Sequence, residues 1–239
     1  FRDGTVLPQD TLYTVFSDPS RYNSVPLITG TNRDEAKLFL AQDPEFVELR
    51  FGFLPRVKDL QAYNELSAYL TDSWKAMAVD GIADIIAANS SEPVFAYRWD
   101  WDEGGKSWLI DYSELLGAAH GLEVAYIFGG FDGAIGAPGL YTDNNIAGRD
   151  LLGQQMRSYW SEFASTGAPG NGRSGVLPQW RAWSNAGPNL MLLDTASGGG
   201  LRMVNEPMTV AMLKERIAQD PNIPELRSRC ALHVQLFLL

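Results

Sequence analysis

The sequence has few of the features that would tie it to a particular compartment or partner. Its single cysteine, Cys230, cannot form a disulfide bond within the chain, which fits a reducing compartment. No apolar run approaches the roughly 20 residues that a membrane span requires. Lys and Arg number 19 against 29 Asp and Glu, which gives a net charge of −10. This balance argues against nucleic acid and anionic membrane surfaces as partners, because both repel an acidic chain.

Several catalytic and cofactor motifs are also missing. No Gly-x-Ser-x-Gly run occurs, so the sharp turn that exposes a nucleophilic serine after a strand is absent from the sequence. No Cys/His pair has the spacing of zinc ligands, and no glycine-rich nucleotide motif follows a predicted strand. The triplet Gly198-Gly199-Gly200 has no histidine before it, so we interpret it as a turn. We therefore expect no metal ion and no cofactor.

The start of the sequence has no recognisable targeting signal. The chain begins at Phe1, without a basic segment that leads into an apolar core. We expect residues 1–239 to be the carboxyl-terminal portion of one domain that continues upstream. Because a signal peptide would lie in that upstream part, a bacterial cytoplasmic location and a secreted one both stay open.

Histidine is scarce, and one of the two histidines is a candidate for chemistry. His120 lies between Gly117 and Gly121, just before an apolar helical pattern, where an imidazole can point into a cleft. One interpretation is a structural loop histidine with a satisfied hydrogen bond. The other is a general base, because a neutral imidazole with a pKa of ~6.5 accepts a hydroxyl proton at neutral pH. His233 lies in a C-terminal apolar helix, and we interpret it as structural.

Two adjacent carboxylates, Asp34 and Glu35, follow a predicted strand, and Glu35 lies 85 positions before His120 (120 − 35). Asn32 and Glu35 have the spacing of a capping box, so these acids could simply complete a helix start. Alternatively, one of them lies at the carboxyl end of the strand and holds the imidazole. The two roles are compatible, because one acid can cap a helix while the other faces the histidine.

Apolar periodicity predicts strands that alternate with helices. The predicted strands cover residues 25–28, 94–101 and 190–193. The predicted helices cover residues 59–70, 72–89, 147–165, 207–218 and 224–238. Long helical stretches between strands indicate parallel pairing, so we predict an α/β fold with a mostly parallel sheet flanked by helices. Three strands would leave one edge of that sheet open, so we expect it to be incomplete without an upstream segment.

Four stretches, taken in order, are similar to motifs of one enzyme family. Gly30–Phe39 is similar to the family's acid motif and Ala119–Gly129 to its histidine motif. Asp3–Pro8 resembles the segment before the acid-bearing strand, and Tyr159–Pro169 resembles a helix-to-loop signature. With these four stretches, the chain resembles the carboxyl-terminal half of a type-B carboxylesterase, the cholinesterase-like family.

The resemblance implies an α/β-hydrolase fold and hydrolysis of a small-molecule ester through an acyl-enzyme. By position, Glu35 matches the family's catalytic acid and His120 its base. Leu38 and Phe39 match positions that line the family's substrate pocket. The resemblance thus implies that Glu35 and His120 are a catalytic pair.

Two further acids are expected around this pair. Glu123 matches a buried acid near the family's histidine, and Asp34 is the immediate neighbour of Glu35. We expect both to support the pair without contact with the reacting atoms. The tryptophans are dispersed, and for Trp74 and Trp160 we predict core packing.

The serine of the family's triad is not in this sequence. We therefore expect an amino-terminal half of the same protein, which bears the serine, as partner, and we expect the chain alone to be inactive. A non-catalytic cholinesterase-like binding or adhesion domain is the alternative, although the presence of both Glu35 and His120 argues against it. A tryptophan-rich carbohydrate-binding module is a third possibility, and the predominance of predicted helices disfavours it.

Overall fold

The structure, a computed structural model, describes residues 2–131, 137–184, 187 and 189–237. Residue 238, the last of the final predicted helix, lies outside the described residues. None of the described helices is both long and apolar enough to cross a membrane.

The main sheet has four strands in the spatial order β1–β4–β5–β6. They are β1 (Leu27–Asn32), β4 (Val94–Trp99), β5 (Leu190–Leu193) and β6 (Arg202–Val204). The first three are mutually parallel in this order, and β6 returns antiparallel to β5. Asn32 at the end of β1 pairs in register with Trp99 at the end of β4, so the two strands end at the same edge of the sheet. Within the described part of the chain, β1 has a partner strand on one side only.

Helices make up most of the remaining structure. The longer ones are α3 (Leu60–Trp74), α4 (Gly81–Asn89), α7 (Ile146–Thr166), α8 (Val210–Gln219) and α9 (Leu226–Phe237). The short ones are α1 (Leu12–Phe16), η1 (Pro19–Arg21), α2 (Lys37–Leu40), α5 (Tyr112–Leu115) and α6 (Glu123–Phe128). A π-helical segment, η2 (Lys75–Asp80), joins α3 to α4, and a two-stranded hairpin, β2 (Val47–Arg50) and β3 (Leu54–Val57), stands apart from the main sheet.

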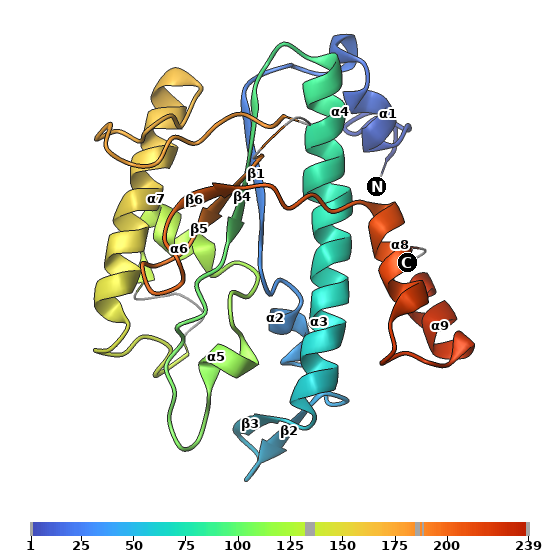
Figure 1. Cartoon of the computed structure of the whole chain (residues 1–239), viewed down its shortest axis with the longest axis vertical. Coiled ribbons are helices and arrows are strands. Elements are labelled where there is room, and N and C mark those ends of the chain that lie inside the picture. Colours follow the sequence, from blue (N-terminus) through green and yellow to red (C-terminus); the bar gives the residue numbers. More distant parts are fainter. Residues whose placement is uncertain (1, 132–136, 185–186, 188, 238–239) are drawn as a thin grey trace.

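Helices cover both faces of the sheet, as Figure 1 shows, with α7 on one side and the α3–α4 run on the other. This arrangement follows from the alternation of side chains along β4. Phe95 and Trp99 point to the face that packs against α6 and α7, where Met156 lies. Ala96 points the opposite way and packs with Val79 of η2 and with α4. The predicted fold class, a mostly parallel sheet flanked by helices, is confirmed.

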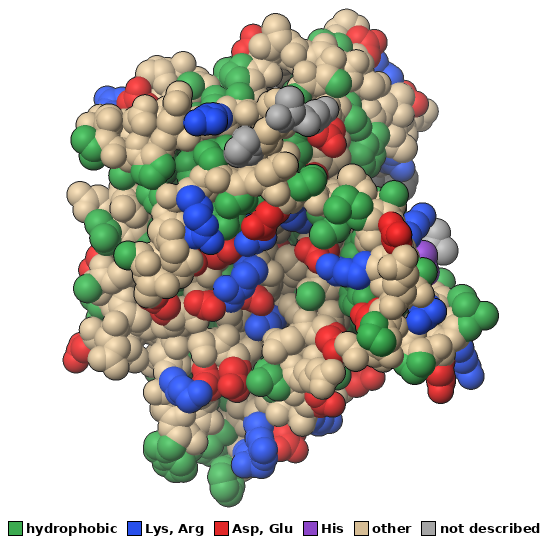
Figure 2. All heavy atoms as spheres, in the orientation of Figure 1, with side chains coloured by type: hydrophobic (Ala, Val, Ile, Leu, Met, Phe, Trp, Pro, Cys, Tyr) green, Lys and Arg blue, Asp and Glu red, His purple; other side chains and the backbone are tan. Residues whose placement is uncertain are grey.

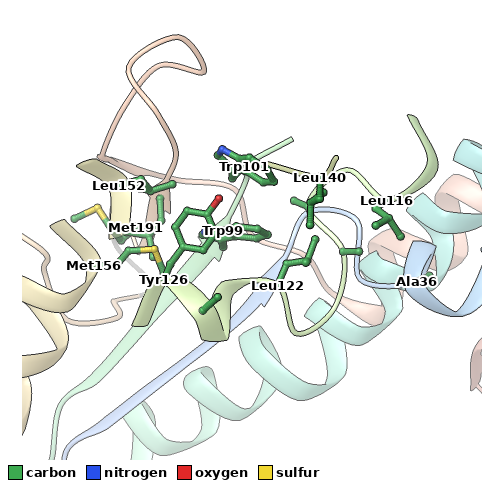
Figure 3. Packing of buried hydrophobic residues seen from close by; sticks show 14 of the residues in the cluster. Ala36, Trp99, Trp101, Leu116, Leu122, Tyr126, Leu140, Leu152, Met156 and Met191 are labelled. Atoms are coloured by element: carbon green, nitrogen blue, oxygen red, sulfur yellow. The ribbon is translucent and has the colours of Figure 1, made fainter. Parts of the chain in front are cut away.

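Aromatic rings fill the core beneath the carboxyl ends of the strands. Figure 3 shows Trp99, Trp101 and Tyr126 packed together. The ring centroid of Trp99 lies 6.0 Å from that of Trp101 and 5.0 Å from that of Tyr126. Leu122, two residues after His120, is fully buried in the same cluster. The loop that carries His120 is therefore anchored to a close-packed core.

Several details differ from the sequence-based predictions: β1, for example, covers Leu27–Asn32 and not residues 25–28. The predicted break at residue 71 is wrong, because α3, η2 and α4 form one helical run from Leu60 to Asn89. Strand β6 and the β2–β3 hairpin were not predicted, since strands of three or four residues carry too little alternation to identify. The glycine triplet 198–200 does lie in the turn between β5 and β6, as expected.

Candidate active site

The candidate site begins where β1 ends. A turn covers residues 33–36, and α2 starts only at Lys37. Glu35 closes this turn: its Oε1 accepts the Asn32 backbone N–H at 2.7 Å and the Thr31 hydroxyl at 3.3 Å. Asp34 and Glu35 both lie in this turn, before α2 begins, and so they do not lie in the first turn of a helix that starts at Asn32.

The second carboxylate oxygen of Glu35 contacts the histidine. Glu35 Oε2 lies 2.6 Å from His120 Nδ1. The Glu35 side chain is 6% exposed and that of His120 is 40% exposed, so a buried acid holds an imidazole at the surface. Among the described residues, none hydrogen-bonds to Nε2 of His120. The ring is thus oriented through one nitrogen and open to a reactant through the other.

Asn32 links the pair to a third acid. Its side-chain amide donates to the Ala119 carbonyl at 2.9 Å and to the Glu123 carboxylate. Asn32 is 1% exposed, and its backbone N–H also bonds to Glu35. One buried amide therefore connects the acid, the peptide before the histidine and Glu123, which begins α6. The sequence pattern indicates Asn32 only as a possible helix cap.

Asp34 faces the histidine loop and not the imidazole. Its Oδ2 accepts the Ala118 backbone N–H at 3.0 Å, and its own N–H donates to the Ala118 carbonyl at 3.0 Å. Arg33 and Lys37 also contact the carboxylate, at 2.9 and 3.2 Å. Asp34 therefore fixes the backbone two residues before His120, in a position between two cations.

Gly117 allows this close approach. Its φ of +50° lies in the left-handed region, and a Cβ built on it would lie 2.5 Å from Asp34 Oδ2. A side chain at residue 117 would therefore displace the carboxylate that holds Ala118. Gly121, on the other side of His120, also has a positive φ of +79°, but space around it is open. The first glycine is required by packing and conformation, and the second by conformation alone.

Two aromatic rings stand beside the imidazole. The ring centroid of Phe39 is 5.5 Å from that of His120, and the ring centroid of Trp74 is 5.1 Å from it. The expectation that Trp74 packs in the core is wrong: its side chain is 39% exposed, because it lies at the last residue of α3, beside the site. Leu38 is partly buried against the main core. The sequence offered no signal for Trp74, since a ring at helical spacing usually packs inward.

The neighbouring acids have opposite electrostatic environments. Burial raises the pKa of Glu35 above its ordinary 4.5, and the bonds from Asn32 and His120 offset this only in part. Burial also acts on Asp34, but Lys37, Arg33 and the Ala118 N–H outweigh it and hold the pKa of Asp34 below its ordinary 3.8. Asp34 is therefore a fixed negative charge, whereas Glu35 is a carboxylate that gains from a proton or a positive charge beside it.

The arrangement can accept and return a proton. A hydroxyl placed at Nε2 of His120 can transfer its proton to the ring, and Glu35 then stabilises the imidazolium through Nδ1. The described residues contain no group of three or more His, Cys, Asp or Glu side chains placed to bind a metal ion. The Glu35–His120 pair can act as a general base toward a hydroxyl that reaches Nε2.

Comparison with known proteins identifies similar sequences and folds. The model of the carboxylesterase family matches residues 54–209. The para-nitrobenzyl esterase of Bacillus subtilis is 25% identical over 184 residues, which is 72% of this chain and 35% of that protein. The acetylcholinesterase of Danio rerio is 27% identical over 103 residues, 43% of this chain and 14% of that protein. The chain thus spans about a third or less of the curated relatives it matches.

A solved structure of a para-nitrobenzyl esterase has the same fold. It superposes with a TM-score of 0.58 and 20% sequence identity, over 90% of this chain and 42% of that one. At this identity the likeness concerns the fold alone, and it gives the α/β-hydrolase fold to the sheet and helices described above.

Proposed function

The chain belongs to the carboxylesterase family, and we propose that it supplies the acid and the base of a serine ester hydrolase. Glu35 is the acid and His120 the base. The observation that carries the proposal is the 2.6 Å contact between Glu35 Oε2 and His120 Nδ1, which leaves Nε2 open to a hydroxyl. Residues 1–239 are then the carboxyl-terminal portion of one α/β-hydrolase domain.

The mechanism follows from the two ring nitrogens. A serine hydroxyl attacks the ester carbonyl while His120 Nε2 takes its proton, and Glu35 stabilises the imidazolium. The imidazolium returns that proton to the departing alcohol, which leaves an acyl-serine. Water then attacks the acyl group through the same base, and the carboxylic acid departs. The products are an alcohol and a carboxylic acid, with the enzyme restored.

The serine comes from outside this sequence. No Gly-x-Ser-x-Gly run occurs in it, and its relatives are much longer than the matched part. We place the nucleophile and the donors that hold the oxyanion on the amino-terminal half of the same protein. The 239-residue chain alone is then inactive. Phe39 and Trp74 form the part of the substrate cleft beside the base, and the substrate is a small-molecule ester.

A fluorophosphonate probe, which labels activated serines, tests the proposal. The natural protein that contains this sequence is treated with the probe, as are its His120→Ala and His233→Ala variants. We expect labelling of the natural protein and of the His233→Ala variant, and loss of labelling in the His120→Ala variant. The two histidines make a matched pair, since the ring of His233 lies against Phe237 of its own helix, α9, and not against Glu35.

Two results would contradict parts of the proposal. An unlabelled natural protein would favour the alternative, a non-catalytic cholinesterase-like binding domain. Labelling of the 239-residue chain by itself, dependent on His120, would mean that the nucleophile lies within this sequence, and peptide mapping of the probe would then locate it.

A further inference from the structure

A groove of about 800 Å³ lies between the β2–β3 hairpin and the segment of residues 106–115. Apolar side chains of the main core form part of its floor, among them Val57, Leu60 and Leu115. Figure 1 places both segments at the lower end of the molecule, and Figure 2 shows hydrophobic side chains gathered there beside charged ones. Among the described residues that line the groove, neither Glu35 nor His120 occurs, so this is a different place from the candidate active site.

At the tip of the β2–β3 hairpin, Phe51 has a backbone conformation that is unfavourable for its residue type. Phe51 and Gly52 are the central residues of a turn, in which the Phe53 N–H donates to the Arg50 carbonyl at 3.2 Å. Their φ angles are +52° and +79°, a combination that favours Asn or Gly at the first position and disfavours Phe. The Phe51 side chain is 84% exposed, so no packing within the described chain compensates for this conformation.

The opposite wall also presents an aromatic ring to solvent. Trp108 lines the groove and is 90% exposed. Two large rings, 57 positions apart in the sequence (108 − 51), therefore line one groove and have little contact with the other described residues. A bound apolar group would bury parts of both rings, which is a favourable contact that the described residues do not provide.

The rim of the groove is more basic than the chain as a whole. Four cationic side chains line it against two carboxylates, in a chain of net charge −10. These cations are Arg50, Arg56, Lys58 and Lys106. Lys106 pairs with Asp111, whereas Arg50 and Arg56 share one carboxylate, that of Glu48, at 3.3 and 4.0 Å. Two guanidinium groups that share one carboxylate keep a net positive charge and further N–H donors for a second carboxylate.

We propose that this groove binds a long-chain carboxylate. The ligand's carboxylate bonds to Arg50 and Arg56, and its alkyl chain lies on the apolar floor beneath Phe51 and Trp108. The volume is within the range of small-molecule sites, and the combination of apolar floor and cationic rim matches an amphiphilic anion. This site goes beyond ester hydrolysis and stands independently of it.

Titration of the natural protein that contains this sequence with decanoate tests the site, with calorimetry as the readout. Phe51→Asn is the most informative variant, because Asn suits the turn and so removes the ring without harm to the hairpin. We expect this variant to bind decanoate about tenfold more weakly, on the order of the affinity that a partly buried Phe contributes, with an unchanged or higher urea midpoint. Phe128→Asn is the matched control, since Phe128 is 81% exposed on α6, outside the groove lining, and should bind as the wild type does.

Two related ligands test the charge. Decyltrimethylammonium has a similar alkyl chain and the opposite charge, and 1-decanol has no charge. We expect decanoate to bind at least tenfold more tightly than the cation, and we expect the double variant Arg50→Gln/Arg56→Gln to weaken decanoate without an effect on 1-decanol. Equal affinity for decanoate and the cation would overturn the proposal, as would the absence of saturable binding.

The His120→Ala variant separates this proposal from ester hydrolysis. We expect it to bind decanoate as the wild type does, whatever its effect on probe labelling. If His120→Ala abolishes decanoate binding while Phe51→Asn and Trp108→Ser leave it intact, the ligand occupies the cleft beside His120, and the groove assignment is wrong.

Discussion

Asp34 and Glu35 are adjacent in one turn, yet the structure uses them in opposite ways. Asp34 lies between Arg33 and Lys37 and holds the Ala118 peptide, and its pKa is lowered. Glu35 is buried against the histidine, and its pKa is raised. Two carboxylates of nearly the same chemistry thus become a structural charge and a partner for a base. The difference shows that the environment, and not the residue type, assigns the role.

The largest expected effect concerns the Glu35 side of this comparison. In the natural protein that carries the serine, Glu35→Gln should lower the rate of fluorophosphonate labelling by about 10³–10⁴-fold, because an amide cannot stabilise the imidazolium. The free energy of unfolding of the 239-residue chain should change by only about 1 kcal/mol, since the raised pKa already favours a neutral group there.

The control for this variant is Glu45→Gln, at an exposed position. It should alter neither the labelling rate nor the urea midpoint. A Glu35→Gln protein that is labelled as fast as the wild type would remove Glu35 from the mechanism and leave it as a turn residue.

The next effect concerns Asp34. Asp34→Asn leaves the ammonium of Lys37, whose side chain is 8% exposed, without its negative partner. Removal of one member of a buried ion pair costs about 3 kcal/mol of folding free energy, so urea denaturation should show a loss of that order. Asp10→Asn breaks an exposed pair with Arg21 and should cost less than about 1 kcal/mol. Equal losses in the two variants would contradict the buried role of Asp34.

The glycines beside His120 offer a smaller and sharper test. Gly117→Ala combines a positive φ with a Cβ 2.5 Å from Asp34 Oδ2, and we expect it to cost about 2–3 kcal/mol. Gly121→Ala has the positive φ alone and should cost about 1 kcal/mol. Urea midpoints of the two variants measure the difference. If Gly121→Ala is the more damaging, the contact between residue 117 and Asp34 does not restrain the loop.

The pH dependence of stability should have opposite signs for the two acids. Because the pKa of Asp34 is lowered by folding, its stabilising contribution is present above its ordinary 3.8 and is lost as pH falls through the lower folded value. Because the pKa of Glu35 is raised, the folded state binds a proton more readily, so protonation of Glu35 adds stability as pH falls toward 4.5. Relative to wild type, Asp34→Asn should therefore become less damaging in acid, and Glu35→Gln more damaging. Unfolding measured from pH 7 down to about pH 3 tests this, and parallel curves for the two variants would contradict it.

Part of the fold could be predicted from the sequence because it depends on local repetition. The alternation along Val94–Trp101 identified β4, and the helical spacing of Leu152 and Met156 identified α7 with its glycine cap at Gly167. The edge strand β6 and the hairpin could not be predicted, since their residues owe their conformation to the strands they pair with. The continuity of α3, η2 and α4 was missed for a related reason: a π turn changes the apolar spacing within an unbroken helix.

Only the site residues that lie within the two sequence motifs could be predicted from the sequence. The sequence named Glu35 and His120, and the structure brings them into contact, while their catalytic roles stay proposals. Asn32 and Trp74 could not be placed, because each acts through a neighbour that is distant in sequence. Asn32, for example, reaches Ala119 and Glu123, and a spacing of nearly 90 residues leaves no trace in a local pattern.

The π-helical segment has a consequence for how this chain tolerates change in length. A π turn contains about one residue more than an α turn, so deletion of one residue between Lys75 and Asp80 would restore a regular helix. Because each residue of the wider turn rotates less than an α-helical residue, the six residues of η2 turn through about the same angle as five α-helical residues, and α4 would keep its orientation relative to α3. Ala83 and Ile86 of α4 would then still face the sheet, and Trp74 would keep its place beside the imidazole. The wide turn of η2 therefore accommodates one extra residue within a continuous helical run. On one side of it α3 keeps Trp74 beside the imidazole, and on the other side α4 keeps Ala83 and Ile86 against the sheet.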